Sequence, residues 1–100
     1  KVKAVWDYQT SDLFSDAERS ALHLAFAAGQ VPNAATDEHF AALDTHYSER
    51  QKTEIIAVIS MFGFLNRWND SLATKLEDRP FDSASALFTA EQWQPGKHRV

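Results

Sequence analysis

The chain has 100 residues, of which 44% are hydrophobic and 24% are charged, and its formal net charge at pH 7 is −4. This composition is typical of a globular protein and excludes an intrinsically disordered chain. The 10 Lys and Arg residues are scattered along the sequence. Nucleic-acid binding depends largely on clustered basic side chains, so we expect no nucleic-acid partner. The absence of cysteine excludes disulfides, thiolate metal sites and thiol catalysis within this sequence.

The first predicted α-helix covers residues 16–28. Ser15 and Glu18 have the spacing of a capping box, in which each side chain accepts a hydrogen bond from the backbone N–H of the other residue. Gly29 is suited to the left-handed position that commonly follows a helix end. Residues 1–13, ahead of this helix, are predicted to be the end of another helix and a linker.

Two more helix starts follow. Thr36 precedes two acidic residues, which is typical of an N-cap and a first helical turn. Ser48 and Gln51 form a second capping-box pattern, and they predict a long helix over residues 49–74. At 1.5 Å per residue, such a helix is roughly 40 Å long.

The whole sequence, residues 1–100, is predicted to form a single all-α domain. Its helical core covers residues 14–76 and ends at Glu77–Pro80. Residues 77–100 are expected to contain one short helix, over 83–91, and an irregular tail.

Residues 55–65 are the most apolar stretch of the chain, because nine of the eleven side chains are apolar. A helix with this composition must be buried on every side, and a chain of this size has little protein with which to cover it. The stretch is too short to span a membrane, which needs roughly 20 apolar residues. We therefore expect no membrane partner, a cytoplasmic location and a homo-oligomer. The predicted interface residues are Ile55, Ile59, Phe62, Leu65 and Trp68.

The sequence contains no recognisable catalytic, cofactor or metal motif. His39 and His46 are seven residues apart, about 10 Å along a helix, which is too far for two ligands of one metal ion. Gly-x-Ser-x-Gly and glycine-rich phosphate loops are absent. We therefore predict no catalytic residue, cofactor or metal ion for this chain.

A second group of residues is a candidate polar pocket that could hold a small-molecule ligand. Each member also has a structural interpretation: a cap, an ion pair or a hydrogen bond between helices. The candidates are His23, Glu54, Asn66, Arg67 and Asn69.

Three segments, Phe14–Leu22, Thr36–Leu43 and Phe62–Asn69, resemble in residues, order and spacing the AhpD-like, or carboxymuconolactone decarboxylase, family. The closing Trp93–His98 is similar to the same family. This resemblance covers roughly residues 2–98. It implies an all-α fold in which small chains assemble through their long helices into dimers, trimers or hexamers.

Activity in the redox branch of this family depends on a Cys-x-x-Cys motif, with a Glu before it and a His after it. The present sequence has no cysteine and resembles the C-terminal half of such a protein, so no catalytic residue of the family can be assigned to it. The first interpretation is a non-catalytic, self-associating helical domain that binds a small ligand or a partner at the subunit boundary. The alternative is part of a peroxidase, a disulfide reductase or a decarboxylase-like enzyme whose active residues lie outside this chain. For a decarboxylase, Arg67 and His23 are the groups that could contact an anionic lactone.

Overall fold

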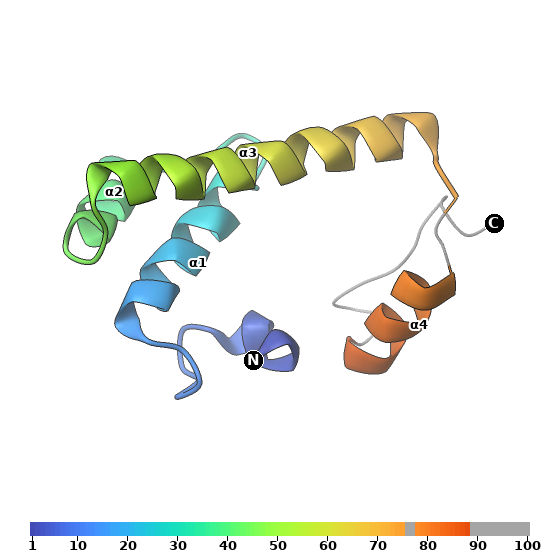
Figure 1. Cartoon of the computed structure of the whole chain (residues 1–100), viewed down its shortest axis with the longest axis horizontal. Coiled ribbons are helices and arrows are strands. Elements are labelled where there is room, and N and C mark those ends of the chain that lie inside the picture. Colours follow the sequence, from blue (N-terminus) through green and yellow to red (C-terminus); the bar gives the residue numbers. More distant parts are fainter. Residues whose placement is uncertain (76–77, 89–100) are drawn as a thin grey trace. The chain divides into compact units, whose positions relative to one another are not determined.

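A computed structural model describes residues 1–75 and 78–88, and the regular structure in these ranges is entirely helical (Figure 1). The elements are the 3₁₀ helix η1 (Val2–Asp7) and the α-helices α1 (Asp16–Ala28), α2 (Asp37–Asp44), α3 (Glu49–Leu72) and α4 (Asp78–Leu87). The predicted all-α class is confirmed. Residues 3–63 form one compact unit, and the residues from Phe64 onward belong to a second, so each is described by itself.

Helix α1 begins and ends where the sequence predicts. The Glu18 N–H donates to Ser15 Oγ at 3.1 Å, and the Ser15 N–H donates to Glu18 Oε1 at 3.0 Å, so the capping box is complete. The expectation of a left-handed Gly29 is wrong, because its φ is −80°. Its N–H donates instead to the Ala25 carbonyl at 3.0 Å, which ends the helix without a left-handed residue.

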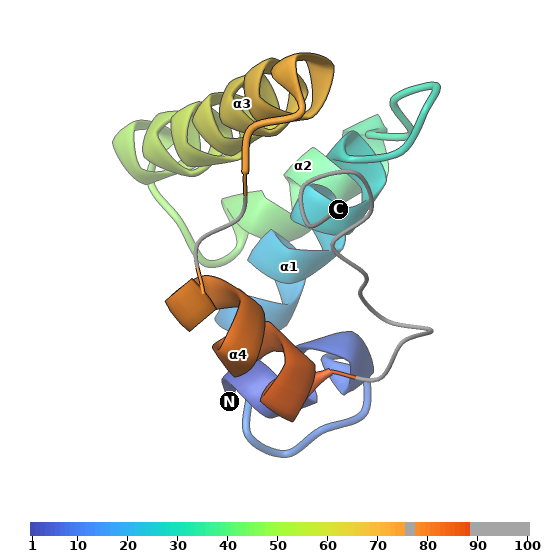
Figure 2. The same cartoon turned by 90° about the vertical axis from the view of Figure 1, so that its right-hand side faces the viewer.

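Helices α1 and α2 pack together, and they lie side by side in both views of the chain (Figures 1 and 2). Leu24 of α1 and Leu43 of α2 are completely buried. Tyr8, Phe14 and Ala27 are the other buried hydrophobic residues of the described ranges. The apolar core of residues 1–63 is therefore small and centred on these two helices.

The segment before α1 is held by Arg19. Its Nε donates to the Tyr8 carbonyl at 3.1 Å and its Nη2 donates to the Ser11 carbonyl at 2.6 Å. Asp16, one turn earlier on α1, accepts from Nη1 at 2.9 Å and orients the guanidinium. The helix predicted at the start of the chain is the 3₁₀ helix η1.

Helix α3 begins at the second predicted capping box. The Gln51 N–H donates to Ser48 Oγ at 3.2 Å, and the Ser48 N–H donates to Gln51 Oε1 at 2.9 Å. The helix ends at Leu72 rather than at residue 74, because Ala73 adopts a left-handed conformation with a φ of 51°. The Thr74 N–H then donates to the Asn69 carbonyl at 3.1 Å, which is typical of a Schellman motif.

Helix α4 begins at Asp78, five residues earlier than the predicted start at 83. Residues 78–80, at which the helical core is predicted to end, form the first turn of α4, and that core boundary stays a prediction. Proline is tolerated there because a first-turn N–H has no intrahelical acceptor. The predicted residues 89–91 of this helix and the tail at 93–98 lie outside the described residues. Among the helices that the structure describes, none has the length and apolarity needed to cross a membrane.

Candidate interaction groove and exposed helix face

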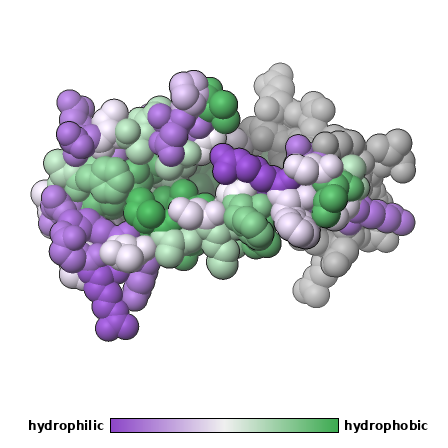
Figure 3. Space-filling model, turned by 90° about the horizontal axis from the view of Figure 1, so that it is seen from above, coloured by the Kyte–Doolittle hydropathy of each residue, from purple (hydrophilic) through white to green (hydrophobic). Residues whose placement is uncertain are grey.

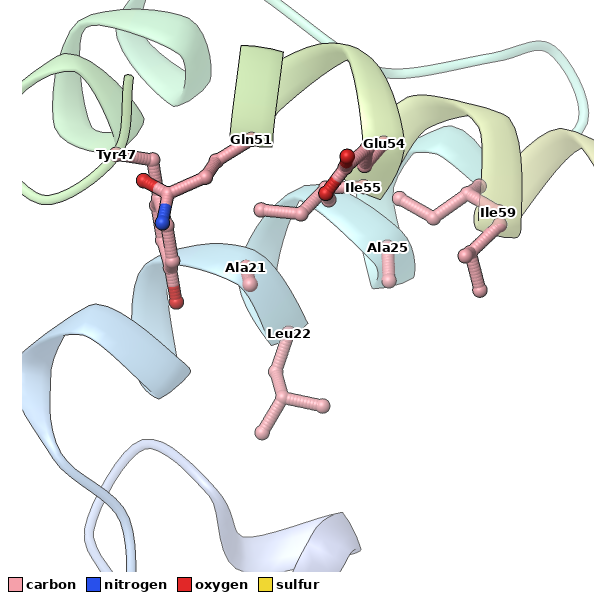
Figure 4. Close-up of a pocket in the computed structure, with 9 residues that line it drawn as sticks. Ala21, Leu22, Ala25, Tyr47, Gln51, Glu54, Ile55 and Ile59 are labelled. Atoms are coloured by element: carbon pink, nitrogen blue, oxygen red, sulfur yellow. The ribbon is translucent and has the colours of Figure 1, made fainter. Parts of the chain in front are cut away.

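An open groove of about 460 Å³ lies between α1 and the first half of α3, within residues 3–63. Figure 4 shows Ile55 and Ile59 extending from α3 towards α1. Nine residues line the groove: Ala21, Leu22 and Ala25 of α1, Tyr47 before α3, and Gln51, Glu54, Ile55, Val58 and Ile59 of α3. Most of these side chains are apolar, and the alanines of α1 leave space above that helix.

The polar groups at the groove already have partners nearby. The Tyr47 hydroxyl donates to the Ala17 carbonyl at 2.9 Å. Gln51 belongs to the capping box of α3. Glu54 pairs with Arg50 one turn earlier on the same helix, with 3.3 Å between Glu54 Oε1 and Arg50 Nε. The groove therefore offers apolar contact, and none of its lining residues is an activated nucleophile.

Helix α3 contains no buried residue within the single chain. The burial predicted for it depends on a second copy of the chain and stays a prediction. Of the predicted interface residues, Ile55 and Ile59 are half-buried, whereas Phe62, Leu65 and Trp68 are 56%, 40% and 57% exposed. Val58, Met61 and Phe64 are also more than half exposed. Figure 3 shows the molecule from above, with apolar patches that are interrupted by hydrophilic side chains. Exposed apolar side chains in such number are typical of an interaction surface, and self-association through α3 stays a prediction.

The five candidate pocket residues have different surroundings. Glu54 lies at the groove, whereas His23 contacts Tyr8 and His39. Asn66, Arg67 and Asn69 are exposed on α3 beyond Gly63. Their action as one pocket stays a prediction.

Sequence reasoning missed a cluster that joins η1, α1 and α2. The Tyr8 hydroxyl is 2.9 Å from His23 Nδ1, and the rings of His23 and His39 have centroids 4.7 Å apart. His39 also caps α2, because its Nδ1 accepts from the Thr36 N–H at 2.9 Å. The sequence signal was the Thr-x-x-His spacing, in which histidine takes the position that Glu or Gln occupies in a capping box.

Two charged side chains have shifted pKa values, and both belong to helix starts. The hydrogen bond from the Ser15 N–H, followed by that from Lys1, lowers the pKa of Glu18 to about 2. Hydrogen bonds to Asp44 and then Glu49 raise the pKa of Lys52. These interactions stabilise local structure. Within residues 1–75 and 78–88, no group of three or more His, Asp or Glu side chains is placed to hold a metal ion.

Two crystal structures of one protein resemble this chain in fold and sequence. The described chain resembles the all-α AhpD-like fold of the debrominase Bmp8, with a TM-score of 0.82 and 40% sequence identity for the apo crystal structure. That match covers 87% of this chain and 47% of Bmp8. A crystal structure of a cysteine-to-alanine variant of Bmp8 in complex with 2,3,4-tribromopyrrole matches with a TM-score of 0.83, also at 40% identity, and covers 87% of this chain and 46% of Bmp8.

A curated relative is an uncharacterized protein of Escherichia coli (strain K12), YnjA. It is 36% identical over 72 residues, which cover 72% of this chain and 40% of YnjA. The chain thus spans less than half the length of either relative. No family model matches the sequence.

Proposed function

We propose that this chain is a non-catalytic helical framework of AhpD-like descent that self-associates through the apolar face of α3. The observation that carries this proposal is the exposure of large apolar side chains along a helix that has no buried residue. Likeness to Bmp8 supports the AhpD-like descent. The groove beside α1 continues the same apolar surface and supplies a place for a small apolar ligand or a partner at the subunit boundary.

Energetics favour covering this face. Complete burial of a Val, Ile, Leu or Phe side chain stabilises by roughly 1.5 to 3 kcal/mol relative to exposure. Ile55, Val58, Ile59, Phe62 and Leu65 lie along this face of the helix and are all partly or largely exposed. Their combined burial in two copies would be large enough to oppose the loss of translational and rotational freedom on association, about 4 to 15 kcal/mol.

Sedimentation equilibrium at micromolar concentration tests self-association. The unmodified chain should sediment with a molar mass above that of a monomer. Phe62→Asp should dissociate this assembly, because it forces a charge into a contact without water. Ser60→Asp is the matched control. Ser60 is exposed and lies two residues earlier, about 200° around the helix, so the same charge should be tolerated there. A stable monomer, or equal dissociation by both variants, would overturn this proposal.

The alternative function is part of an AhpD-like enzyme whose reacting residues lie outside this chain. It is favoured by the likeness to Bmp8, a debrominase for which a cysteine-to-alanine variant has been crystallised with a brominated pyrrole. In both interpretations this chain lacks the cysteine needed to supply a thiolate. The two differ in whether a further polypeptide segment makes the framework active.

Activity assays separate these interpretations. With the chain alone, we expect neither hydroperoxide consumption with a dithiol donor nor bromide release from 2,3,4-tribromopyrrole above the buffer rate. General acid–base help contributes typically 10²- to 10⁴-fold to a reaction, but it cannot replace the missing nucleophile. Turnover by the metal-free chain would overturn the non-catalytic interpretation and would direct attention to His23, Glu54 and Arg67.

A further inference from the structure

The groove between α1 and α3 changes in character along its length. In Figure 4, Tyr47 and Gln51 lie at one end, Ile59 lies at the other, and Glu54 and Ile55 lie between them. From Gln51 to Ile59 the groove follows α3 for about 12 Å, at 1.5 Å per residue. One end of the groove is therefore polar and the other is apolar, which suits an elongated ligand with a single polar end.

Glu54 carries the only charge among the nine residues that line the groove. In the described part of the chain, its carboxylate bonds one side chain, with 3.3 Å between Glu54 Oε1 and Arg50 Nε, so Oε2 is available to a ligand. The side chains of Glu54 and Arg50 are 64% and 89% exposed, and an exposed ion pair of this kind contributes little to stability. A positively charged ligand can therefore compete with Arg50 for the carboxylate.

The remaining polar side chains of the groove are uncharged. The Tyr47 hydroxyl donates to the Ala17 carbonyl at 2.9 Å, so it can only accept from a ligand. Gln51 Oε1 accepts from the Ser48 N–H at 2.9 Å, which leaves the Nε2 donors. The positive end of the α3 dipole favours anions, but its effect is confined to the first turn and Glu54 lies beyond that turn. The choice between a cation and an anion therefore depends on Glu54.

We propose that this groove binds a small amphiphilic cation, an alkylammonium ion whose charged group pairs with Glu54 and whose chain lies along Ile55, Val58 and Ile59. This inference rests on one part of the proposed function, that the groove holds a small ligand, and it names the chemical class of that ligand. An alkylammonium group resembles the lysine side chain and is protonated at neutral pH. Burial of the alkyl chain supplies most of the affinity. The carboxylate orients the ligand and selects for positive charge.

The test measures the binding of octylammonium, octanol and octanoate to the chain at pH 7. These probes share one alkyl chain and differ in the charge of the head group. NMR signals of the Ile55, Val58 and Ile59 methyl groups report occupation of the groove. We expect octylammonium to bind most tightly and octanoate least tightly, with Kd values that differ by about tenfold. Equal Kd values for these two probes, or tighter binding of octanoate, would overturn the proposal.

Glu54→Gln removes the charge and keeps the size of the side chain. It should bring the Kd values of octylammonium and octanoate close together and leave that of octanol unchanged. Glu38→Gln is the matched control, because Glu38 is exposed on α2 outside the groove and its loss changes the net charge of −4 by the same amount. The control should keep the tenfold difference. An equal loss of selectivity in both variants would indicate a general attraction of the acidic chain for cations and would overturn the site at Glu54.

Sedimentation equilibrium separates this inference from self-association. The groove lies within one chain, so a monomer that binds octylammonium selectively would support the inference and overturn self-association. An oligomer whose groove methyl signals respond to none of the probes would overturn the inference and leave self-association standing. Binding of octanol without any effect of head-group charge would also overturn the inference, although the groove would then still hold an apolar ligand.

Discussion

The α1–α2 pair and helix α3 use similar apolar side chains with opposite outcomes. Leu24 of α1 and Leu43 of α2 are completely buried, whereas α3 buries none of its residues. Both regions begin their helices with satisfied caps. Local hydrogen bonding thus defines where these helices begin, but burial depends on what a second element or a second molecule supplies. This difference predicts that equal truncations will have unequal effects in the two regions.

The largest expected effect comes from truncating the α1–α2 core. Leu24→Ala should destabilise the chain by about 2 to 5 kcal/mol, because it removes buried contacts and leaves a cavity. Val58→Ala on α3 should cost less than about 0.5 kcal/mol at low protein concentration, since Val58 is 52% exposed. Chemical denaturation measures both variants.

Measurements at several protein concentrations test whether a second copy of the chain covers α3. Raising the protein concentration should increase the cost of Val58→Ala if copies of the chain cover α3, and it should leave the cost of Leu24→Ala unchanged relative to the unmodified chain. Equal costs for the two truncations at low concentration would contradict the difference in burial between the regions.

The second prediction concerns the caps, which the two regions share. Ser15→Ala and Ser48→Ala should each cost about 0.5 to 2 kcal/mol, because each leaves a first-turn N–H without its acceptor. Thermal melts compare them with Ser→Gly at the same positions, which should cost only a few tenths of a kcal/mol relative to Ser. An unchanged midpoint in both alanine variants would contradict the capping geometry.

Local features of this fold could be predicted from the sequence, and features set by distant contacts could not. The capping boxes at Ser15 and Ser48 depend on residues three positions apart, and both are confirmed. The anchoring of the N-terminal segment by Arg19 depends on carbonyls 8 and 11 residues away, which no periodicity indicates. The contact between His23 and His39 likewise requires α1 and α2 to be packed first.

The candidate site shows the same division. Apolar composition identified the face of α3 that bears Ile55 and Phe62, but it gave no information about the groove with α1, because Ala21 and Ala25 are unremarkable in sequence. The prediction of a left-handed conformation at Gly29 was wrong for a related reason. Helix ends have several solutions of similar energy, and here the left-handed residue occurs at Ala73 instead.

A third prediction concerns that residue at the end of α3. Left-handed backbone costs an L-residue roughly 1 to 2 kcal/mol, and glycine avoids this cost but loses more entropy on folding. Ala73→Gly should therefore stabilise the chain by about 0.5 to 1 kcal/mol. Ala57→Gly, at an exposed interior position of α3, should instead destabilise it by about 1 kcal/mol. A denaturation midpoint that rises in Ala73→Gly and falls in Ala57→Gly would confirm the backbone geometry. A lower midpoint in both variants would contradict it.

The smallest expected effect is the acid dependence that Glu18 contributes to α1. Its pKa is lowered from 4.5 to about 2, first by the hydrogen bond from the Ser15 N–H and then by Lys1. A lowered carboxyl pKa stabilises the fold above the unfolded value, and this contribution is lost as the pH falls from about 4.5 through about 2. The effect is modest, because the Glu18 side chain is 42% exposed and solvent screens its charge.

Glu18→Gln isolates this contribution, because glutamine still accepts from the Ser15 N–H but carries no charge. Thermal melts from pH 5 to pH 2 should show a steeper loss of stability for the unmodified chain than for this variant, and the two should converge near pH 2. Lys1→Gln should keep most of the slope, since the Ser15 N–H is the larger cause of the lowered pKa. If Lys1→Gln removes the slope as fully as Glu18→Gln, the ion pair rather than the helix cap holds the Glu18 carboxylate in its charged form.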